Sequence, residues 1–199
     1  MKRIITTLAT LICALSLVAQ TTTIEAPQTD ALYRLPMAKG AKVAARALAP
    51  TNLGVAMHQN LRDFCAWEIS TTNPTDIVAP REGTVESANE NSLLILHPDG
   101  IYTRLSALEG VCVAVGDKVE KGDKVGTAYH TSKGTWRVWM EVFHLKSNPT
   151  YGTEAQSGNY ERLVQYINPI FSTRGKCKTQ LTDGGAYTVK ARTWCWPWE

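Results

Sequence analysis

The sequence lacks the patterns that identify several common classes of protein. It contains no C-x-x-C pair, no low-complexity tract and no internal repeat of domain length. Its charge is nearly balanced, with 21 basic and 18 acidic residues, whereas a nucleic-acid-binding chain usually carries a basic stripe. A cysteine zinc site and a nucleic-acid partner are therefore not expected.

Beyond its N-terminus, the sequence also has no apolar run that could span a membrane. The first 19 residues comprise a cationic start at Lys2 and Arg3, a mainly apolar run over Ile4–Val18, and the small residue Ala19. This is the pattern of a secretory signal peptide, and the run is shorter than the roughly 20 residues that a transmembrane anchor needs. We therefore expect residues 1–19 to be removed and the mature protein to be exported, periplasmic or extracellular, with no membrane span.

Four cysteines follow the expected signal peptide, and an even number in an exported chain favours disulfide bonds. Cys177 and Cys195 are close in sequence, and a bond across so short a loop would contribute about 3 kcal/mol in the chain-entropy model. We expect this bond to pin residues 173–199 as a C-terminal extension. Cys65 and Cys112 are either a second pair or two small buried side chains.

The mature chain divides into a lead and one β domain of ordinary size. Residues 20–50 are rich in Thr, Ala and Pro without a sustained period, which favours an extended lead or linker. Its apolar residues Leu32, Tyr33 and Leu35 are able to dock on the domain. Residues 51–172 form the expected domain, which contains many short apolar runs bounded by turn residues and so predicts an all-β sandwich or barrel.

The expected elements of this domain are mostly strands. One short helix is expected over Asn159–Ile167, ended by Pro169, and a last strand over Ala186–Trp194, which would make the extension a β-hairpin. The expected strands are Phe64–Ile69, Asp76–Ala79, Thr84–Ala88, Ser92–His97, Tyr102–Leu105, Val111–Val115, Val125–His130 and Trp136–His144.

Two segments carry the glycine-turn pattern of a duplicated β motif. Ala79–Val85 is a strand that enters a turn at Gly83, and Val115–Gly126 contains two Gly-Asp-Lys-Val units. Glycine permits tight corners with positive φ, and the valines are expected to point into a core. The segments resemble the halves of a barrel-sandwich hybrid, shared by biotinyl/lipoyl carriers, membrane-fusion adaptors and lysostaphin/LytM-type peptidases. A carrier would need a modifiable lysine at a hairpin tip, which the sequence does not provide.

The remaining segments resemble the lysostaphin/LytM-type zinc peptidases, in order, over Gln59–Pro169. Leu94–Leu105 is similar to the family's strand that ends in His, turns at Gly and leads to Tyr-x-His-Leu. Val125–Tyr129 and Trp136–Val142 are similar to its glycine-ended strand and its His-x-His-Phe-Glu-Val strand. Gln59–Phe64 stands where the family has His-x-Gly-x-Asp. The resemblance implies a barrel-sandwich hybrid fold built from a duplicated hybrid motif.

The same resemblance implies that the catalytic site is lost. The family holds zinc by the first His, the Asp four residues later and the second His of His-x-His, which correspond to Gln59, Asp63 and Trp139. Its two assisting histidines correspond to Arg104 and Arg137. Arginine is permanently protonated and tryptophan offers only a donor, so one of three zinc ligands remains. We therefore expect no zinc, no other cofactor and no peptidase activity.

No other histidine restores the ligand set. His58 is one residue out of register with Gln59 and would need a β-bulge to turn toward Asp63. Even then only two ligands would converge. His97, His130 and His144 are expected at strand ends or on the surface.

Charged side chains are expected where the metal would have been. The two-residue period of the strand Trp136–His144 places Val138, Met140 and Val142 toward the core and Arg137, Trp139, Glu141 and Phe143 on the other face. A buried carboxylate is costly unless it is paired, so we expect Asp63 to pair with Arg137 or Arg104. The alternative is a solvated arginine without a partner. We call the following six residues the vestigial site: Gln59, Asp63, Arg104, Arg137, Trp139 and Glu141.

The sequence thus favours a non-catalytic cell-envelope domain that binds peptidoglycan or a cell-wall hydrolase through the inherited groove. Two alternatives stay open. One is an active zinc endopeptidase that cleaves peptidoglycan peptides, with ligands aligned differently. The other is a structural or adhesive exported module in which the tryptophan-rich tail around Cys195 makes the contacts.

Overall fold

The computed structural model describes residues 31–48, 66–145, 164–173 and 176–189. These residues form strands, turns and loops without a helix, and hence contain no helix that could cross a bilayer. The strands are β1 (Leu32–Arg34), β2 (Lys42–Leu48), β3 (Ala66–Thr71), β4 (Asp76–Val78), β5 (Gly83–Asn89), β6 (Ser92–Leu96), β7 (Ile101–Ser106), β8 (Leu108–Val111), β9 (Lys118–Val119), β10 (Lys124–His130), β11 (Trp136–Leu145), β12 (Val164–Tyr166), β13 (Ile170–Thr173), β14 (Lys176–Thr179) and β15 (Ala186–Thr188).

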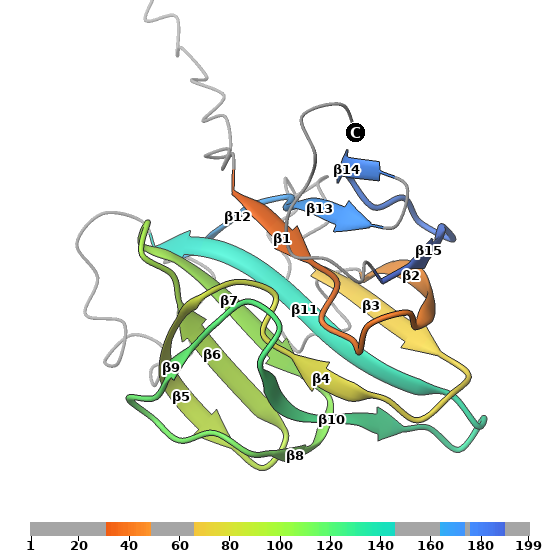
Figure 1. The fold of residues 1–199 in the computed structure, drawn as a ribbon, viewed down its shortest axis with the longest axis horizontal. Helices are drawn as coiled ribbons and strands as arrows, with labels where there is room; N and C mark the ends of the chain where they lie inside the picture. The colour runs from red at the N-terminus through yellow and green to blue at the C-terminus, as the bar shows by residue number, and fades with distance from the viewer. Residues whose placement is uncertain (1–30, 49–65, 146–163, 174–175, 190–199) are drawn as a thin grey trace, which may run out of the picture.

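Strand β11 is the centre of the larger sheet, and crosses most of the molecule (Figure 1). It pairs antiparallel with β3 on one side and with β7 on the other, while its ends pair with β10 and β12. The order of this sheet is β15-β2-β3-β11-β7-β6-β5-β9, and β10 also pairs with β4 and β8. A smaller sheet has the order β1-β13-β14. The expected all-β class is confirmed, and neither sheet closes into a barrel.

The two faces of β11 alternate as the sequence predicted. Val138, Met140 and Val142 are at most 2% exposed and belong to the main core, which also includes side chains of the smaller sheet such as Tyr33 and Phe171. Burial of these apolar groups is the main favourable contribution to folding. At one end of β11, aromatic side chains pack over the opposite face. There Phe143 stacks on Tyr102 and packs edge-on against Tyr166.

The two Gly-Asp-Lys-Val units form two equivalent turns. Gly116 and Gly122 have φ of 91° and 105°, a conformation that glycine adopts without strain. In each unit the aspartate accepts a hydrogen bond from the backbone N–H three residues before it, at 2.8 Å for both Asp117 and Asp123. The valine that ends each unit is buried, as predicted.

The two strands nearest the N-terminus correct the prediction of an extended lead over residues 20–50. β1 pairs in parallel with β13, and β2 pairs with both β3 and β15. Tyr33 and Leu35 are fully buried, so the docking that was expected of them occurs as part of a folded sheet. The period of β2 is hard to see in the sequence because three of its seven residues are alanine.

Two further predictions differ from the structure. Val164–Tyr166, expected to end a helix, is strand β12, because pairing with the end of β11 fixes it as extended chain. The strand expected over Val111–Val115 is instead Leu108–Val111. The rest of the expected helix, the signal peptide and most of the expected last strand lie outside the described residues.

Of the four cysteines, the structure describes Cys112 and Cys177. Cys112 is exposed and free, so it is neither bonded to Cys65 nor a buried side chain. Cys177 lies in β14, whereas Cys65 and Cys195 lie outside the described residues. The bond between Cys177 and Cys195 therefore stays a prediction.

The close approach of β8 and β10, which pair antiparallel, provides a test of the fold. A Cβ atom on Gly126 would lie 2.4 Å from the carbonyl oxygen of Gly110, whereas a Cβ atom on Gly110 would meet nothing within 4 Å. We predict that Gly126→Ala lowers the free energy of unfolding by about 1–3 kcal/mol, because the backbone of β8 or β10 would have to move to make room for the methyl group. Gly110→Ala, the matched control, should change it by less than about 0.5 kcal/mol. Chemical denaturation of both variants measures the difference, and equal effects would contradict this packing.

Candidate functional site

Four residues of the vestigial site lie side by side on the face of the sheet opposite the main core. Arg104 is on β7 and is directly opposite Glu141 of β11. Arg137 and Trp139 lie on the same face of β11, and Trp139 is directly opposite Glu68 of β3. Gln59 and Asp63 lie outside the described residues, so the pairing expected of Asp63 stays a prediction.

The first part of this face is a buried ion pair. Arg104 donates from Nε to Oε2 of Glu141 and from Nη2 to Oε1, the latter over 2.7 Å. The hydroxyl of Tyr166 donates to the same Oε1 over 3.3 Å. The Glu141 side chain is only 2% exposed, against 23% for Arg104. The attraction between charges this deeply buried offsets their desolvation only in a close geometry such as this bidentate one.

The second part is centred on Glu68, which is not among the six predicted residues of the vestigial site. Its carboxylate accepts a hydrogen bond from Nε1 of Trp139 over 3.0 Å and from Nη1 of Arg137 over 3.2 Å. Arg46 of β2 lies 3.1 Å from the other oxygen. Burial raises the pKa of Glu68, but the Trp139 hydrogen bond and the two arginines outweigh it, so the pKa lies below its usual value.

Glu68 could have been found from its position in the strand. Trp67 and Ile69 are apolar and point to the core, so Glu68 must point to the opposite face. The carboxylate expected to pair with the arginines was Asp63. The sequence does not show how β3 and β11 are paired. In the folded sheet their antiparallel register places Glu68 opposite Trp139.

Arg137 connects this ion pair to aromatic rings. Its guanidinium carbon lies 5.2 Å from the centre of the Trp139 ring and 5.5 Å from that of Tyr129. Both distances allow a cation–π interaction.

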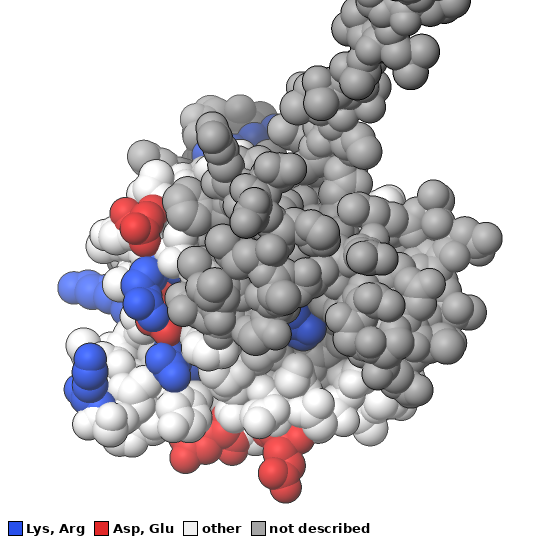
Figure 2. All heavy atoms as spheres, turned by 180° about the vertical axis from the view of Figure 1, so that it is seen from behind, with Lys and Arg blue, Asp and Glu red and all other residues white. Residues whose placement is uncertain are grey.

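Figure 2, which views the molecule from behind, shows basic and acidic side chains interspersed among the described residues, without a large patch of one sign.

His97 has a structural role and does not belong to this face. Its Nδ1 donates to the carbonyl oxygen of Glu82 over 2.7 Å, which leaves Nε2 to accept from the Thr103 hydroxyl, also over 2.7 Å. Burial lowers the pKa of His97 to about 4, so the ring is neutral near pH 7. His130 stacks on Trp136, whereas His58 lies outside the described residues.

The side chains of this face do not fit a zinc ion. Trp139 presents an N–H donor that is already bonded to Glu68, and Arg104 and Arg137 are cations. Zinc in a catalytic site needs about three protein ligands that offer lone pairs. Among the described residues, no three His, Cys, Asp or Glu side chains are grouped so that they could hold a metal.

Comparison with known proteins shows what the central part of the chain is similar to. Residues 65–150 match the model of peptidase family M23. No curated protein matches the chain. The M23 metalloprotease pseudoalterin from the deep sea has a TM-score of 0.52 at 12% identity, over 81% of this chain and 96% of that one. At this identity the likeness shows a shared fold.

Two other solved structures are also similar. Helicobacter pylori Csd3 has a TM-score of 0.42 at 13% identity, over 57% of this chain and 30% of that one. A chain of the complex of SpoIIIAH and SpoIIQ has a TM-score of 0.39 at 18% identity, over 53% of this chain and 90% of that one.

The ion pair between Arg104 and Glu141 can be measured by a double-mutant cycle. We predict a coupling free energy of about 2–3 kcal/mol between Arg104→Gln and Glu141→Gln, because either change alone leaves a desolvated charge. The exposed pair Lys124 and Asp76, whose atoms lie 2.8 Å apart, is the matched control and should couple by less than about 1 kcal/mol. Similar coupling in both pairs, measured by chemical denaturation, would contradict the assigned burial.

Proposed function

From the premise that residues 65–150 are a peptidase M23 domain of the LytM-like type, we propose that this protein is an exported, non-catalytic member of that family. In this proposal the face that carries the vestigial site binds peptidoglycan in the cell envelope. The observation that carries it is the hydrogen-bonded set of arginine, tryptophan and glutamate side chains on the central strands.

The absence of catalysis is supported by the state of these side chains. The positions that correspond to two assisting histidines and one zinc ligand of the family hold Arg104, Arg137 and Trp139. Each is bonded to a glutamate and thus has a structural role in the sheet. A guanidinium that is permanently protonated cannot act as a general base near neutral pH.

Binding is supported by the composition of the same face. Arg46, Arg104 and Arg137 carry three positive charges, against the two negative charges of Glu68 and Glu141. Peptidoglycan peptides present carboxylates and amides, which guanidinium groups bind in defined geometries. Arg46 is 59% exposed and Arg137 30% exposed, so both are accessible to a ligand, whereas Glu141 is not.

Action on a partner hydrolase is a second form of the same proposal, since a domain that binds peptidoglycan can position an active enzyme. The tryptophan-rich tail that would support an adhesive module lies outside the described residues. No observation on the described part of the chain favours it over the sheet face.

Sedimentation with purified cell-wall sacculi tests this proposal. We expect the mature protein to bind, and the double variant Arg46→Gln with Arg137→Gln to bind about tenfold more weakly, because it loses two charge-assisted contacts. The matched control is Lys118→Gln with Lys178→Gln, which removes the same charge from exposed lysines elsewhere.

The control should bind within about twofold of the unchanged protein. Thermal unfolding of each variant separates loss of binding from loss of folding. Equal binding by the two folded double variants would contradict the proposed role of this face, and no binding by the unchanged protein would contradict the function itself.

A further inference from the structure

Two basic side chains lie where the smaller sheet contacts the larger one, Arg34 on β1 and Lys121 in the turn between β9 and β10. The backbone N–H of Arg34 donates to the carbonyl oxygen of Pro80 over 2.9 Å. The Nζ atom of Lys121 donates to the carbonyl oxygen of Leu32. Two turns of the larger sheet, one before β5 and one before β10, therefore contact the edge of β1 that does not pair with β13.

The guanidinium of Arg34 lies against the backbone of the turn before β10. A Cβ atom on Gly122 would be 2.5 Å from its Nη1, so this close approach requires the glycine, whose φ is 105°. Nη2 donates to the carbonyl oxygen of Met37 over 3.3 Å. Nε is buried without a partner, whereas Nη1, which also has none in the described part of the chain, is not buried. Nη1 can therefore donate to a ligand.

No carboxylate forms an ion pair with either cation among the residues that the structure describes. Glu82 lies near Lys121, but its carboxylate contacts Nε of Arg81 over 3.4 Å. Asp99 is bonded to the same arginine, with its Oδ2 atom 2.7 Å from Nη1. The acidic side chains of this region are thus already paired with Arg81.

Burial makes both positive charges costly. It lowers the pKa of Arg34, and it is the main reason why the pKa of Lys121 lies below its usual value. Glu82 acts against this effect on Lys121, while the charges of Arg81 and Arg34 add to it. A half-buried cation is stabilised by a counter-ion. Because the described part of the chain does not place one beside Arg34, an anion from outside would stabilise the pair.

A phosphate group suits these two cations. Its doubly charged form balances both of them, whereas a carboxylate carries a single charge. A guanidinium matches the geometry of phosphate oxygens, and a lysine binds phosphate as a point charge. Arg34 precedes residues 65–150, which match the family model, so the pair joins this part of the chain to a segment outside it.

We propose that Arg34 and Lys121 form a binding site for a phosphate group, which links β1 to the turn before β10. The smaller sheet packs on the core face of the larger sheet through Tyr33 and Phe171, so this site and the vestigial site lie on opposite sides of the main core. The two share no residue, and the proposal does not depend on the proposed function. The phosphate is either the free ion or the headgroup of an anionic lipid.

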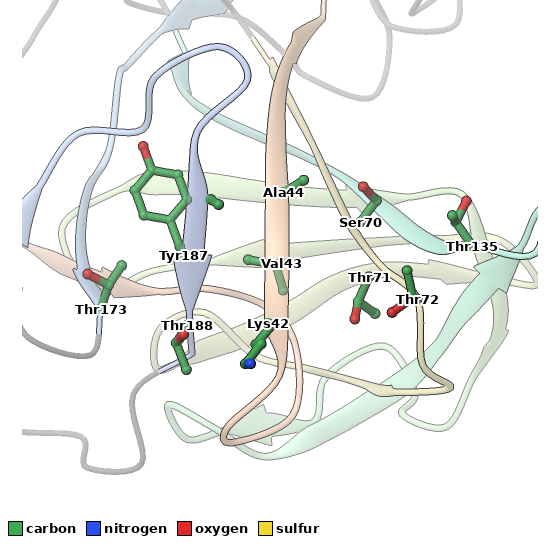
Figure 3. A pocket seen from close by; sticks show the side chains of 11 residues that line it. Lys42, Val43, Ala44, Ser70, Thr71, Thr72, Thr135, Thr173, Tyr187 and Thr188 are labelled. Carbon is green, nitrogen blue, oxygen red and sulfur yellow. The ribbon is translucent and has the colours of Figure 1, made fainter.

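Titration of the whole mature protein with inorganic phosphate, followed by calorimetry, tests the site at about pH 8, where phosphate is mainly doubly charged. We expect saturable binding at constant ionic strength, weakened about tenfold in Lys121→Gln because one charge-assisted contact is lost. Lys42→Gln is the matched control. Lys42 is exposed and is the one charged side chain in the described lining of a hollow of about 770 Å³ at the edge of the larger sheet (Figure 3). This control should bind phosphate within about twofold of the unchanged protein.

A second variant tests the arginine without removing its charge. Arg34→Lys keeps the cation and loses the planar fork, so it should bind phosphate about fivefold more weakly. Thermal unfolding without phosphate verifies that each variant is folded. The site is overturned by the absence of saturable binding to the unchanged protein, by equal binding to folded Lys121→Gln and Lys42→Gln, or by acetate that binds as tightly as phosphate.

Sedimentation with lipid vesicles distinguishes the two sources of the phosphate group. Vesicles of equal parts phosphatidylcholine and phosphatidic acid present a phosphate monoester, and vesicles of phosphatidylcholine alone are the reference. A lipid headgroup as ligand requires that Lys121→Gln sediments with the phosphatidic acid vesicles more weakly than Lys42→Gln does. Equal sedimentation of the two variants, together with titration by inorganic phosphate that depends on Lys121, assigns the site to the free ion.

Discussion

A carboxylate buried in the middle of a sheet has to be neutralised, and this requirement organises the face of the sheet that carries Arg104, Arg137 and Trp139. Glu141 lies at the centre of β11 and is only 2% exposed. Without a cation its desolvation would cost several kcal/mol. Arg104 supplies that cation from the neighbouring strand in a bidentate geometry, with Tyr166 as a third contact. The pair thus joins β7, β11 and β12 through side chains as well as through their backbones.

The same requirement explains the composition of the adjacent positions. Glu68 is less deeply buried and is bonded to Arg46, Arg137 and Trp139, which come from two different strands. All of these groups alternate with core residues along their strands, so a shift of one residue in any register would bury charges and expose apolar groups. The ion pairs therefore favour a single register for these strands.

The sequence was sufficient for the features that depend on local pattern. The all-β class, the alternation of β11 and the buried valines of the Gly-Asp-Lys-Val turns follow from periods of two and from the conformational freedom of glycine. Features that depend on pairing between distant strands were missed. β2 is rich in alanine and has a weak apolar period, and β12 is extended because β11 provides its partner.

The candidate site shows the same division. The two-residue period of β11 correctly placed Arg137, Trp139 and Glu141 on one face, whereas the correspondence of Arg104, Arg137 and Trp139 to family site residues stays a prediction from the resemblance. The sequence did not indicate that Arg104 pairs with Glu141 or that Glu68 takes part, because both facts require the register of three strands. The sequence likewise did not indicate that Cys112 is free and exposed, because this depends on where its loop lies in the folded protein.

The central claim is that polar side chains have replaced a zinc site, and the zinc content of two proteins tests it directly. The account predicts that the purified mature protein holds no stoichiometric zinc. It also predicts that the double variant Gln59→His with Trp139→His, which restores the ligand set around Asp63, holds about one zinc per chain. One tightly bound zinc with a histidine ligand in the unchanged protein, or none in the folded variant, would contradict the account.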